Sequence, residues 1–437
     1  MKLAPPMSPK FRIAMRFSNS SQAAKSVISR HKACLIAFAG ILLSLYAAVV
    51  AYFYLNSSDD VEVDDESLLC QPLNVPDDEN KFVAYLAMTN EVVFSDDACF
   101  LMGLHNVATL PSYRGSASVD MPLLGVSRSV SKRFGDIVDG LYECGEYEKA
   151  VLAICDHYSF ASSCRDNAST AVEEMIGCEL CTMTYWKIVK IATTPDVPDA
   201  LLAEVARIVR ERPDYKSIFG KTLKREYSYF IKPQFCRLDD TAIDLFQETE
   251  SWLRRVAGDW CGAVAARILI NTPGYDRFSY KRKSSLQLIA TAMHEADIQG
   301  LDYSLEVADT DVFEPNWLGR KEWAQLCNSL FEFLRKRLRY DAMSARFSRI
   351  IVALQRYARK HEGEYPESLG ELVPEFLDAV PKDPFDESSE IKYDRGRRIV
   401  WSVGENGECA TPPAECSKRR THEFHKWASR VDGKPWK

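Results

Sequence analysis

The residues with the clearest chemical potential are two cysteines, Cys178 and Cys181, in a C-x-x-C arrangement. Such a pair can lower a thiol pKa and support disulfide exchange when it opens a helix beside a βαβ sheet. Here the pair lies inside a continuous helical pattern, with no parallel-sheet pattern nearby. The apolar residues around it are Met175, Ile176, Leu180, Met183 and Trp186. Core thiols or a structural bridge therefore explain the pair better than a redox centre.

Histidines offer two further possibilities. His157 lies between Cys155 and Cys164, so a zinc cluster with the C-x-x-C pair is conceivable, but these spacings do not match paired zinc knuckles. His294 and Glu295 lack the second histidine, one turn later, that a metalloprotease helix needs. The sequence also has no G-x-S-x-G elbow, no glycine-rich phosphate loop and no Rossmann fingerprint. We therefore expect no catalytic residue and a non-enzymatic function.

A membrane span is predicted near the start of the chain. Residues 33–55 are 23 residues without a charge, which as a helix would be about 34 Å long, enough to cross a bilayer. Residues 1–32 hold seven basic side chains and no acid, whereas the first basic residue after the span is Lys81. The positive-inside rule predicts a cytoplasmic tail, a single pass through the membrane, and the bulk of the chain outside the cytoplasm. A cleaved signal peptide would also start basic, but this apolar run is too long and no A-x-A site follows.

Charge and cysteine content narrow the possible partners and the compartment. The formal net charge is −7, and because the tail contributes +7, the part beyond the span carries −14. A nucleic-acid partner is therefore not expected. Residues 56–79 hold nine carboxylates and are typical of a self-repelling, solvated linker. Thirteen cysteines, twelve of them after the membrane span, favour an oxidising compartment.

Residues 80–340 show helical periodicity almost throughout and predict an α-helical hairpin domain. One apolar stripe comprises Val130, Phe134, Ile137, Val138, Leu141 and Tyr142. The turn at Gly145 then resembles that of a tetratricopeptide-type hairpin, but no period of about 34 residues recurs, so no repeat array is expected. Further helices are expected near residues 168–192, 198–211, 240–270, 283–297 and 320–339. Tryptophans on these segments are expected to lock helix against helix: Trp186, Trp252, Trp260, Trp317 and Trp323.

The last part of the chain changes character. An amphipathic helix is expected to end at Gly363, with Phe347, Ile350, Ile351, Leu354, Tyr357 and Ala358 on one face. A short helix should follow, and residues 392–393 and 399–403 alternate like two strands of a hairpin. These elements are expected to share one core, formed by Ile351, Leu354, Leu369, Leu372, Phe376 and Trp401.

Three turn motifs in this region carry a family resemblance. They are G-x-Y-P (Gly363, Tyr365, Pro366), P-x-D-P-aromatic (Pro381, Asp383, Pro384, Phe385) and W-S-x-G-x-N-G (Trp401, Ser402, Gly404, Asn406, Gly407). In this order they resemble the globular domain of the major pseudopilin of bacterial type II secretion. The resemblance implies a small α+β domain over residues 341–408, followed by a C-terminal tail, residues 409–437. The expected fold class is therefore mainly α, with one transmembrane helix, a helical hairpin domain and this pseudopilin-like domain.

The chain also departs from a pseudopilin. A pseudopilin has its apolar helix directly before the globular domain, with a processed N-terminus and an early glutamate, whereas here the span lies far upstream, holds no acid and lacks the processing motif. The overall layout is instead similar to membrane-anchored proteins of planctomycete and verrucomicrobial bacteria, which implies no chemistry. We expect a membrane-tethered extracytoplasmic interaction or scaffold protein that binds another envelope protein. Two alternatives stay open: an accessory component of a type II secretion or pilus-like machine, and an envelope enzyme without a recognisable motif.

The resemblance also bears on calcium, which the family binds through several aspartates in the loop after the W-S-x-G turn. This chain offers Glu405, Asn406 and Glu408 there, and the later aspartates are missing. Cys409 and Cys416 flank a Pro-Pro turn in their place, and a disulfide between them would close the same loop. We therefore expect this disulfide in place of the ion, and no cofactor.

Overall fold

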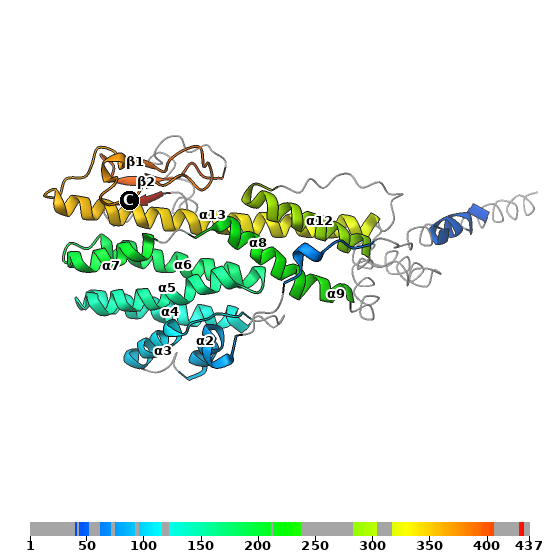
Figure 1. The fold of residues 1–437 in the computed structure, drawn as a ribbon, viewed down its shortest axis with the longest axis horizontal. Helices are drawn as coiled ribbons and strands as arrows, with labels where there is room; N and C mark the ends of the chain where they lie inside the picture. Colours follow the sequence, from blue (N-terminus) through cyan, green and yellow to red (C-terminus); the bar gives the residue numbers. More distant parts are fainter. Residues whose placement is uncertain are drawn as a thin grey trace, which may run out of the picture. The chain divides into compact units, whose positions relative to one another are not determined.

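The computed structural model describes residues 40–41, 43–51, 62–70, 75–91, 96–115, 122–210, 213–236, 283–303, 317–405 and 428–431. The chain divides into two compact units, residues 1–60, 239–284 and 310–320 in the first and residues 61–238, 285–309 and 321–437 in the second. Most described residues belong to the second unit, and they are mainly helical, as expected (Figure 1). In these ranges no helix has both the length and the apolarity to span a bilayer.

The elements alternate between long helices and short connectors. The α-helices are α2 (Lys81–Glu91), α3 (Asp97–Thr109), α4 (Pro122–Glu143), α5 (Tyr147–Asn167), α6 (Ala171–Ala192), α7 (Asp199–Arg210), α8 (Tyr215–Arg225), α9 (Lys232–Cys236), α12 (Lys283–Gln299) and α13 (Trp317–Lys360). Short helical turns are η1 (Glu66–Leu68), η2 (Asp77–Glu79), the π-turn η3 (Glu226–Ile231), η6 (Gly300–Asp302) and η7 (Leu369–Leu372). The strands are β1 (Lys392–Asp394), β2 (Ile399–Trp401) and β3 (Ala428–Arg430). The helix expected near 240–270 lies outside the described residues.

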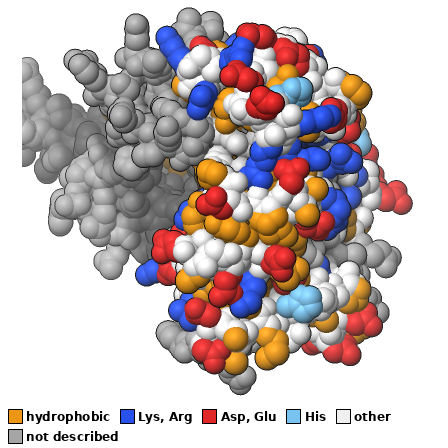
Figure 2. All heavy atoms as spheres, turned by 90° about the vertical axis from the view of Figure 1, so that its left-hand side faces the viewer, with side chains coloured by type: hydrophobic (Ala, Val, Ile, Leu, Met, Phe, Trp, Pro, Cys, Tyr) orange, Lys and Arg blue, Asp and Glu red, His pale blue; other side chains and the backbone are white. Residues whose placement is uncertain are grey.

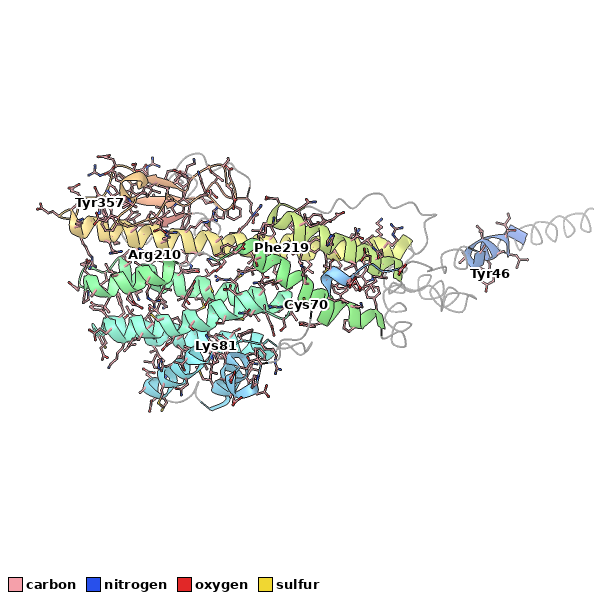
Figure 3. The ribbon with its side chains drawn as sticks, viewed as in Figure 1. Tyr46, Cys70, Lys81, Arg210, Phe219 and Tyr357 are labelled. Carbon is pink, nitrogen blue, oxygen red and sulfur yellow. The ribbon has the colours of Figure 1, made fainter. Side chains whose placement is uncertain are left out.

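The predicted helical hairpin is formed by α4 and α5. Gly145 has a φ of +75°, a left-handed conformation that suits glycine, and it lies in the turn between the two helices. The predicted stripe on α4 is buried at Val130, Phe134, Ile137 and Val138, and it packs in one core with α2, α3, α5, α6 and α7. The side chain of Lys81, at the start of α2 (Figure 3), adds a polar tie to α5, donating to Ser159 Oγ at 2.9 Å and Ser163 Oγ at 3.2 Å.

Helices α5 and α6 form the most extensive helix pair, and a glycine sets their separation. A Cβ built on Gly177 of α6 would lie 2.4 Å from the backbone nitrogen of Arg165 on α5. No side chain fits in that space, so glycine is required for the close approach. Thr170 caps the start of α6 by accepting from the Glu173 N–H.

A second core joins η1, α8, η3, α12 and the first half of α13. This core corrects the prediction for residues 56–79, which were expected to be a solvated spacer. Leu68 is fully buried in the core, and Asp65 accepts from Tyr227 Oη at 2.7 Å and pairs with Lys232 Nζ at 2.7 Å. The described part of this acidic segment therefore packs on the helices, because it supplies an apolar anchor and its carboxylates find partners.

The 44-residue helix α13 crosses the domain boundary predicted at residue 340 without a break. Its first half packs in the second core and its second half in a third core with the C-terminal elements (Figure 1). The helix ends close to the predicted place: Gly363, at φ +94°, donates its N–H to the Ala358 carbonyl at 2.7 Å. The third core contains Ile351, Leu354, Leu369 and Leu372, with Phe376 packed against it, and Trp401 is also buried.

The expected hairpin is present, and the sheet also contains a third strand that was not predicted. β1 and β2 pair antiparallel with Tyr393 opposite Val400, and β3 adds to the free side of β2 with Ser429 opposite Val400. Val431 follows β3 and is fully buried in the third core, where its carbonyl accepts from Gln355 Nε2 at 2.6 Å. Residues 428–431 are therefore part of this fold, although they were assigned to a tail over residues 409–437.

One face of the molecule shows how its surface charges are distributed. In Figure 2, basic and acidic side chains are interspersed on the described part of this face, with a band of hydrophobic side chains across its middle. The described atoms on this face therefore do not form a field of a single sign.

Candidate functional site

The C-x-x-C cysteines lie in the middle of the helical core. Cys178 and Cys181 are both fully buried on α6, and they are free thiols, as are the other six described cysteines. Burial raises the pKa of both thiols well above the usual value, so neither forms a thiolate readily. The structure thus places them as core thiols.

His157 is enclosed on α5 and does not form a zinc cluster. Its ring stacks on Phe134 with centroids 3.9 Å apart, and Nδ1 lies 2.7 Å from Thr184 Oγ1. Because Thr184 Oγ1 donates to the Leu180 carbonyl, it must accept from Nδ1–H, which leaves Nε2 unprotonated. Burial lowers the pKa of His157 to about 3. Within the described ranges, no three His, Cys, Asp or Glu side chains are placed to hold a metal ion.

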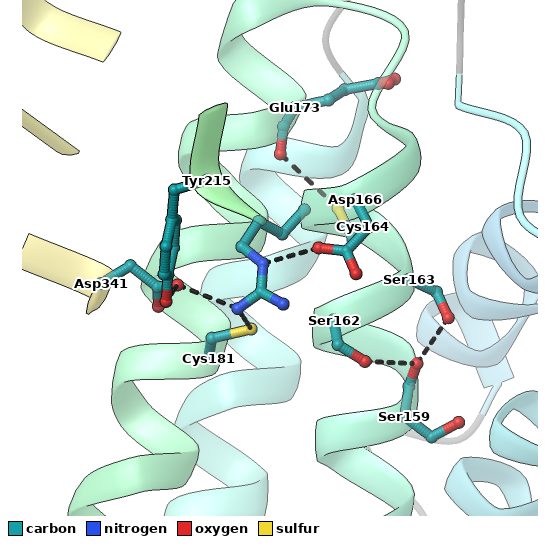
Figure 4. A network of polar contacts seen from close by, with 10 residues as sticks. Ser159, Ser162, Ser163, Cys164, Asp166, Glu173, Cys181, Tyr215 and Asp341 are labelled. Atoms are coloured by element: carbon teal, nitrogen blue, oxygen red, sulfur yellow. Dashed lines mark hydrogen bonds and ion pairs between the residues drawn. The ribbon is translucent and has the colours of Figure 1, made fainter. Parts of the chain in front are cut away.

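A buried ion pair joins α5 to α13 (Figure 4). Arg165 and Asp341 are both almost inaccessible, and Arg165 Nη1 donates to Asp341 Oδ2 at 2.9 Å. Arg165 Nε also donates to Asp166 Oδ1 at 2.7 Å, and Tyr215 Oη donates to Asp341 Oδ2 at 2.9 Å. Nη1 lies 3.7 Å from Cys181 Sγ. With Tyr215 of α8, the ion pair ties three helices together, although the second carboxylate oxygen of Asp341, Oδ1, has no hydrogen-bond partner among the described residues.

Glu174 lies near this pair and is fully buried. Burial raises its pKa to about 8, and the Thr222 hydroxyl beside it and the positive charge of Arg165 oppose that rise only in part. Burial therefore favours the protonated form of Glu174, because a charged carboxylate at this buried position would be costly.

The family-motif positions converge on one polar cluster in the C-terminal fold. Asp383 is fully buried and accepts from Phe385 N–H at 2.9 Å, Ser402 Oγ at 2.8 Å and Val403 N–H at 2.8 Å. Gly404, at φ +74°, donates its N–H to Ser402 Oγ at 3.1 Å. The second and third motifs are thus bonded to each other.

The other motif residues lie around the third core. Tyr365 packs against it, with the Arg398 guanidinium over its ring, and Phe385 meets Tyr340 of α13 edge to face. Pro366 is buried beside Tyr365, Pro384 is buried and Pro381 is half-buried. Asn406, Gly407, Glu408, Cys409 and Cys416 lie outside the described residues. Glu405 pairs with Lys336 of α13 at 2.9 Å.

A groove runs over α6 between α4 and α13 and is called here the α6 groove. Its main part has a volume of about 760 Å³, and a smaller part of about 180 Å³ continues it. The two parts share Glu179, Arg337 and Tyr340. The main part is lined by Ser127, Ser131 and Lys132 of α4, Val172, Met175, Ile176, Glu179, Leu180 and Met183 of α6, and Phe333, Lys336, Arg337 and Tyr340 of α13.

The floor of the α6 groove is mainly apolar and both walls carry cations. Met175 and Met183 are half-buried, and Trp186, in the smaller part, is 45% exposed. Phe333 on the α13 wall is 56% exposed. Arg337 pairs with Glu179 across the floor. An apolar trough with charged edges is suited to binding an amphipathic partner.

Sequence reasoning missed this site because the apolar residues of α6 are spread around the helix and do not mark out one face. Trp186 was expected to lock helix against helix, and that prediction is wrong for this residue, whereas Trp323 does pack on Phe235 with centroids 5.0 Å apart. The accessible groove-lining residues of α6 are three, four and four positions apart in the sequence. They are Val172, Met175, Glu179 and Met183. Nothing in that spacing separates a groove floor from a core stripe.

No family model, no curated protein and no solved structure matches this chain.

Proposed function

We propose that this chain is a membrane-tethered interaction protein that binds a partner protein in the α6 groove. The observation that carries this proposal is the groove itself, an apolar trough about 760 Å³ in volume with exposed aromatic residues at its edges. Large exposed apolar areas are costly in a monomer and mark binding surfaces. The binding residues are Met175 and Met183 on the floor, with Phe333 and Trp186 as flanking anchors.

The tether is residues 33–55, with the tail in the cytoplasm of a bacterium and the bulk of the chain in the periplasm. The long uncharged run and the asymmetry of basic residues around it support this topology. The apolar side chains of Ile41, Leu43 and Leu45 are more than half exposed on their helical segment, which is the exposure that a lipid-facing helix needs.

The C-terminal fold is proposed to be pseudopilin-like. The bonding of Asp383 to Ser402 supports this, because it links two of the three motifs on which the resemblance rests. A second candidate function follows from that observation, namely service as an accessory component of a type II secretion or pilus-like machine. An envelope enzyme has less support, since the α6 groove offers one carboxylate, Glu179, among its described lining residues, and Arg337 pairs with it.

Photo-crosslinking in the native membrane tests the binding function. A photoreactive amino acid at Met183 is expected to capture one partner protein, whereas the same residue at Leu152, 63% exposed on α5, is expected to capture none. The adduct should disappear when Phe333→Asp is added, and the identified partner should then bind the purified full-length chain. Equal labelling at both positions would contradict the proposal. Identification of secretion components would favour the second candidate, and a reporter fused after Lys437 that is active only in the periplasm would support the topology.

A further inference from the structure

We infer that the occupant of the α6 groove is an amphipathic helix of the partner protein that carries carboxylates along the flank facing α4. This inference rests on the proposed function and specifies the chemistry of the partner segment. Its evidence is the geometry of the floor, the exposure of the anchors and the distribution of charge on the two walls.

The floor has the length and the spacing of a helix-binding trough. Val172 and Val189 are the outermost lining residues of the groove on α6, and at the helical rise they are about 26 Å apart. Accessible residues recur between them at intervals of three and four, and Phe333, Arg337 and Tyr340 recur in the same way along α13. A helix laid over α6 would present its own apolar residues at these intervals, as in known helix-in-groove complexes.

The exposure of the anchors argues for a helix rather than an enclosed small molecule. Small-ligand sites bury most of the ligand surface, and their lining is correspondingly enclosed. Here Trp186 and Phe333 are 45% and 56% exposed, so an occupant would be covered on one side only. Met175 and Met183 between them are flexible, polarizable side chains that adapt to an apolar helix face.

The charges on the walls indicate which flank of the helix is acidic. On the α13 wall, Arg337 pairs with Glu179 and Lys336 pairs with Glu405, so both cations are already neutralised. On the α4 wall, Lys132 is exposed, and no ion pair to it is found within the described residues. Beside it, Ser127 and Ser131 are buried. A carboxylate on the occupant would therefore gain most beside Lys132.

Binding of designed peptides to the full-length chain in lipid nanodiscs tests this inference. The probe is a fluorescent helical peptide of about 18 residues with a leucine stripe and glutamates on one flank. Two control peptides share its length: one carries lysines in place of the glutamates, and the other has the same composition with the stripe scrambled. Fluorescence anisotropy gives the affinity of each peptide, and palmitate is added as a competitor.

The acidic peptide is expected to bind at least about tenfold more tightly than either control, and its affinity should fall with salt. Lys132→Glu should weaken the acidic peptide and strengthen the lysine peptide, whereas Lys149→Glu, an exposed lysine on α5, should change neither. Phe333→Ala should weaken both stripe-bearing peptides, and Leu152→Ala should not. The variants must first match the parent chain in circular dichroism and melting temperature.

Four results would overturn the inference. Equal binding of the acidic and lysine peptides would contradict the preference for an acidic flank. Equally tight binding of the scrambled peptide would contradict the need for an apolar stripe on a helix. Displacement of the acidic peptide by palmitate at a lower concentration than by the same peptide without its label would identify an acyl chain as the preferred occupant. If no peptide binds while Met183 still captures a protein in membranes, the inference fails and the binding function stands. If neither experiment succeeds, both fail.

Discussion

Ser402 donates a hydrogen bond of 2.8 Å to Asp383, and this bond fixes the end of the β-hairpin to the proline-rich crossing that precedes it. The same carboxylate accepts from the N–H groups of Phe385 and Val403. A buried carboxylate with three donors is a stable arrangement, because each donor would otherwise lack a partner. The two turns are therefore mutually dependent.

Asp383→Asn is expected to destabilise the chain by about 1 to 3 kcal/mol, because the amide NH₂ would face one of the donors that the carboxylate now accepts from. The free energy of unfolding in urea measures this. Glu387→Gln, an exposed carboxylate in the same segment, is the matched control and should change little. Similar values for the two variants would mean that the cluster contributes nothing to stability.

Removing one member of the buried pair should be more damaging than removing both. Arg165→Met leaves Asp341 buried without its cation and is expected to cost about 3 to 5 kcal/mol. The double variant Arg165→Met with Asp341→Leu should recover a substantial part of that loss, since the uncompensated charge is gone. A double-mutant cycle by denaturant unfolding gives the coupling between the residues, and additive losses would contradict this account.

Leu354→Ala is expected to cost about 2 to 5 kcal/mol, because Leu354 is fully buried in the third core and its truncation leaves a cavity. Leu326→Ala lies on the same helix at a position that is 56% exposed and serves as the control. Differential scanning calorimetry compares the two. A negligible loss for Leu354→Ala would mean that the core collapses around the deletion.

Two buried groups give the stability a defined dependence on pH. The pKa of Glu174 is raised by burial from 4.5 to about 8, so the unfolded chain releases this proton first. The contribution of Glu174 is therefore fully present below about pH 4.5 and is lost as pH rises to about 8, on the order of 5 kcal/mol. Glu174→Gln should remove this decline, and the exposed Glu148→Gln should not.

His157 acts in the opposite direction. Its pKa is lowered by burial from 6.5 to about 3, so its contribution is fully present above about pH 6.5 and is lost as pH falls toward 3. Between about pH 4.5 and 6.5 the two effects oppose each other, so their summed contribution to the free energy of unfolding should be nearly flat there. Urea unfolding across pH 3 to 9 checks this shape. A steady rise in stability through pH 8 would contradict the assignment of Glu174.

The predicted disulfide between Cys409 and Cys416 has its own signature. Cys409→Ser and Cys416→Ser should each lower stability by about 2 to 3 kcal/mol under oxidising conditions, and the double variant should lose no more than either. Thiol labelling and the melting temperature measure this, with and without calcium. A calcium-dependent rise in melting temperature together with free thiols at both positions would show that the ion, and not the disulfide, closes the loop.

The sequence by itself determined the local elements. The stripe on α4, the turn at Gly145, the end of α13 near Gly363 and the β1–β2 hairpin follow from apolar spacing and from residues that fit particular backbone conformations, and both are local properties. The packing of Leu354 with Leu369 and Leu372 was also predictable from the sequence, because these side chains lie on apolar helix faces that must be buried.

Only the tertiary structure decided which distant segments meet. The addition of β3 to β2, the burial of Leu68 within an acidic segment and the pairing of Arg165 with Asp341 join residues far apart in sequence, and no local pattern encodes such partners. The α6 groove has the same origin. From the sequence, Met183 and Trp186 were expected to be core residues. They remain accessible because the walls formed by α4 and α13 leave that side of α6 open. Burial depends on neighbours as well as on side-chain type, so a helix whose apolar residues are spread around it does not reveal which of its faces stays free.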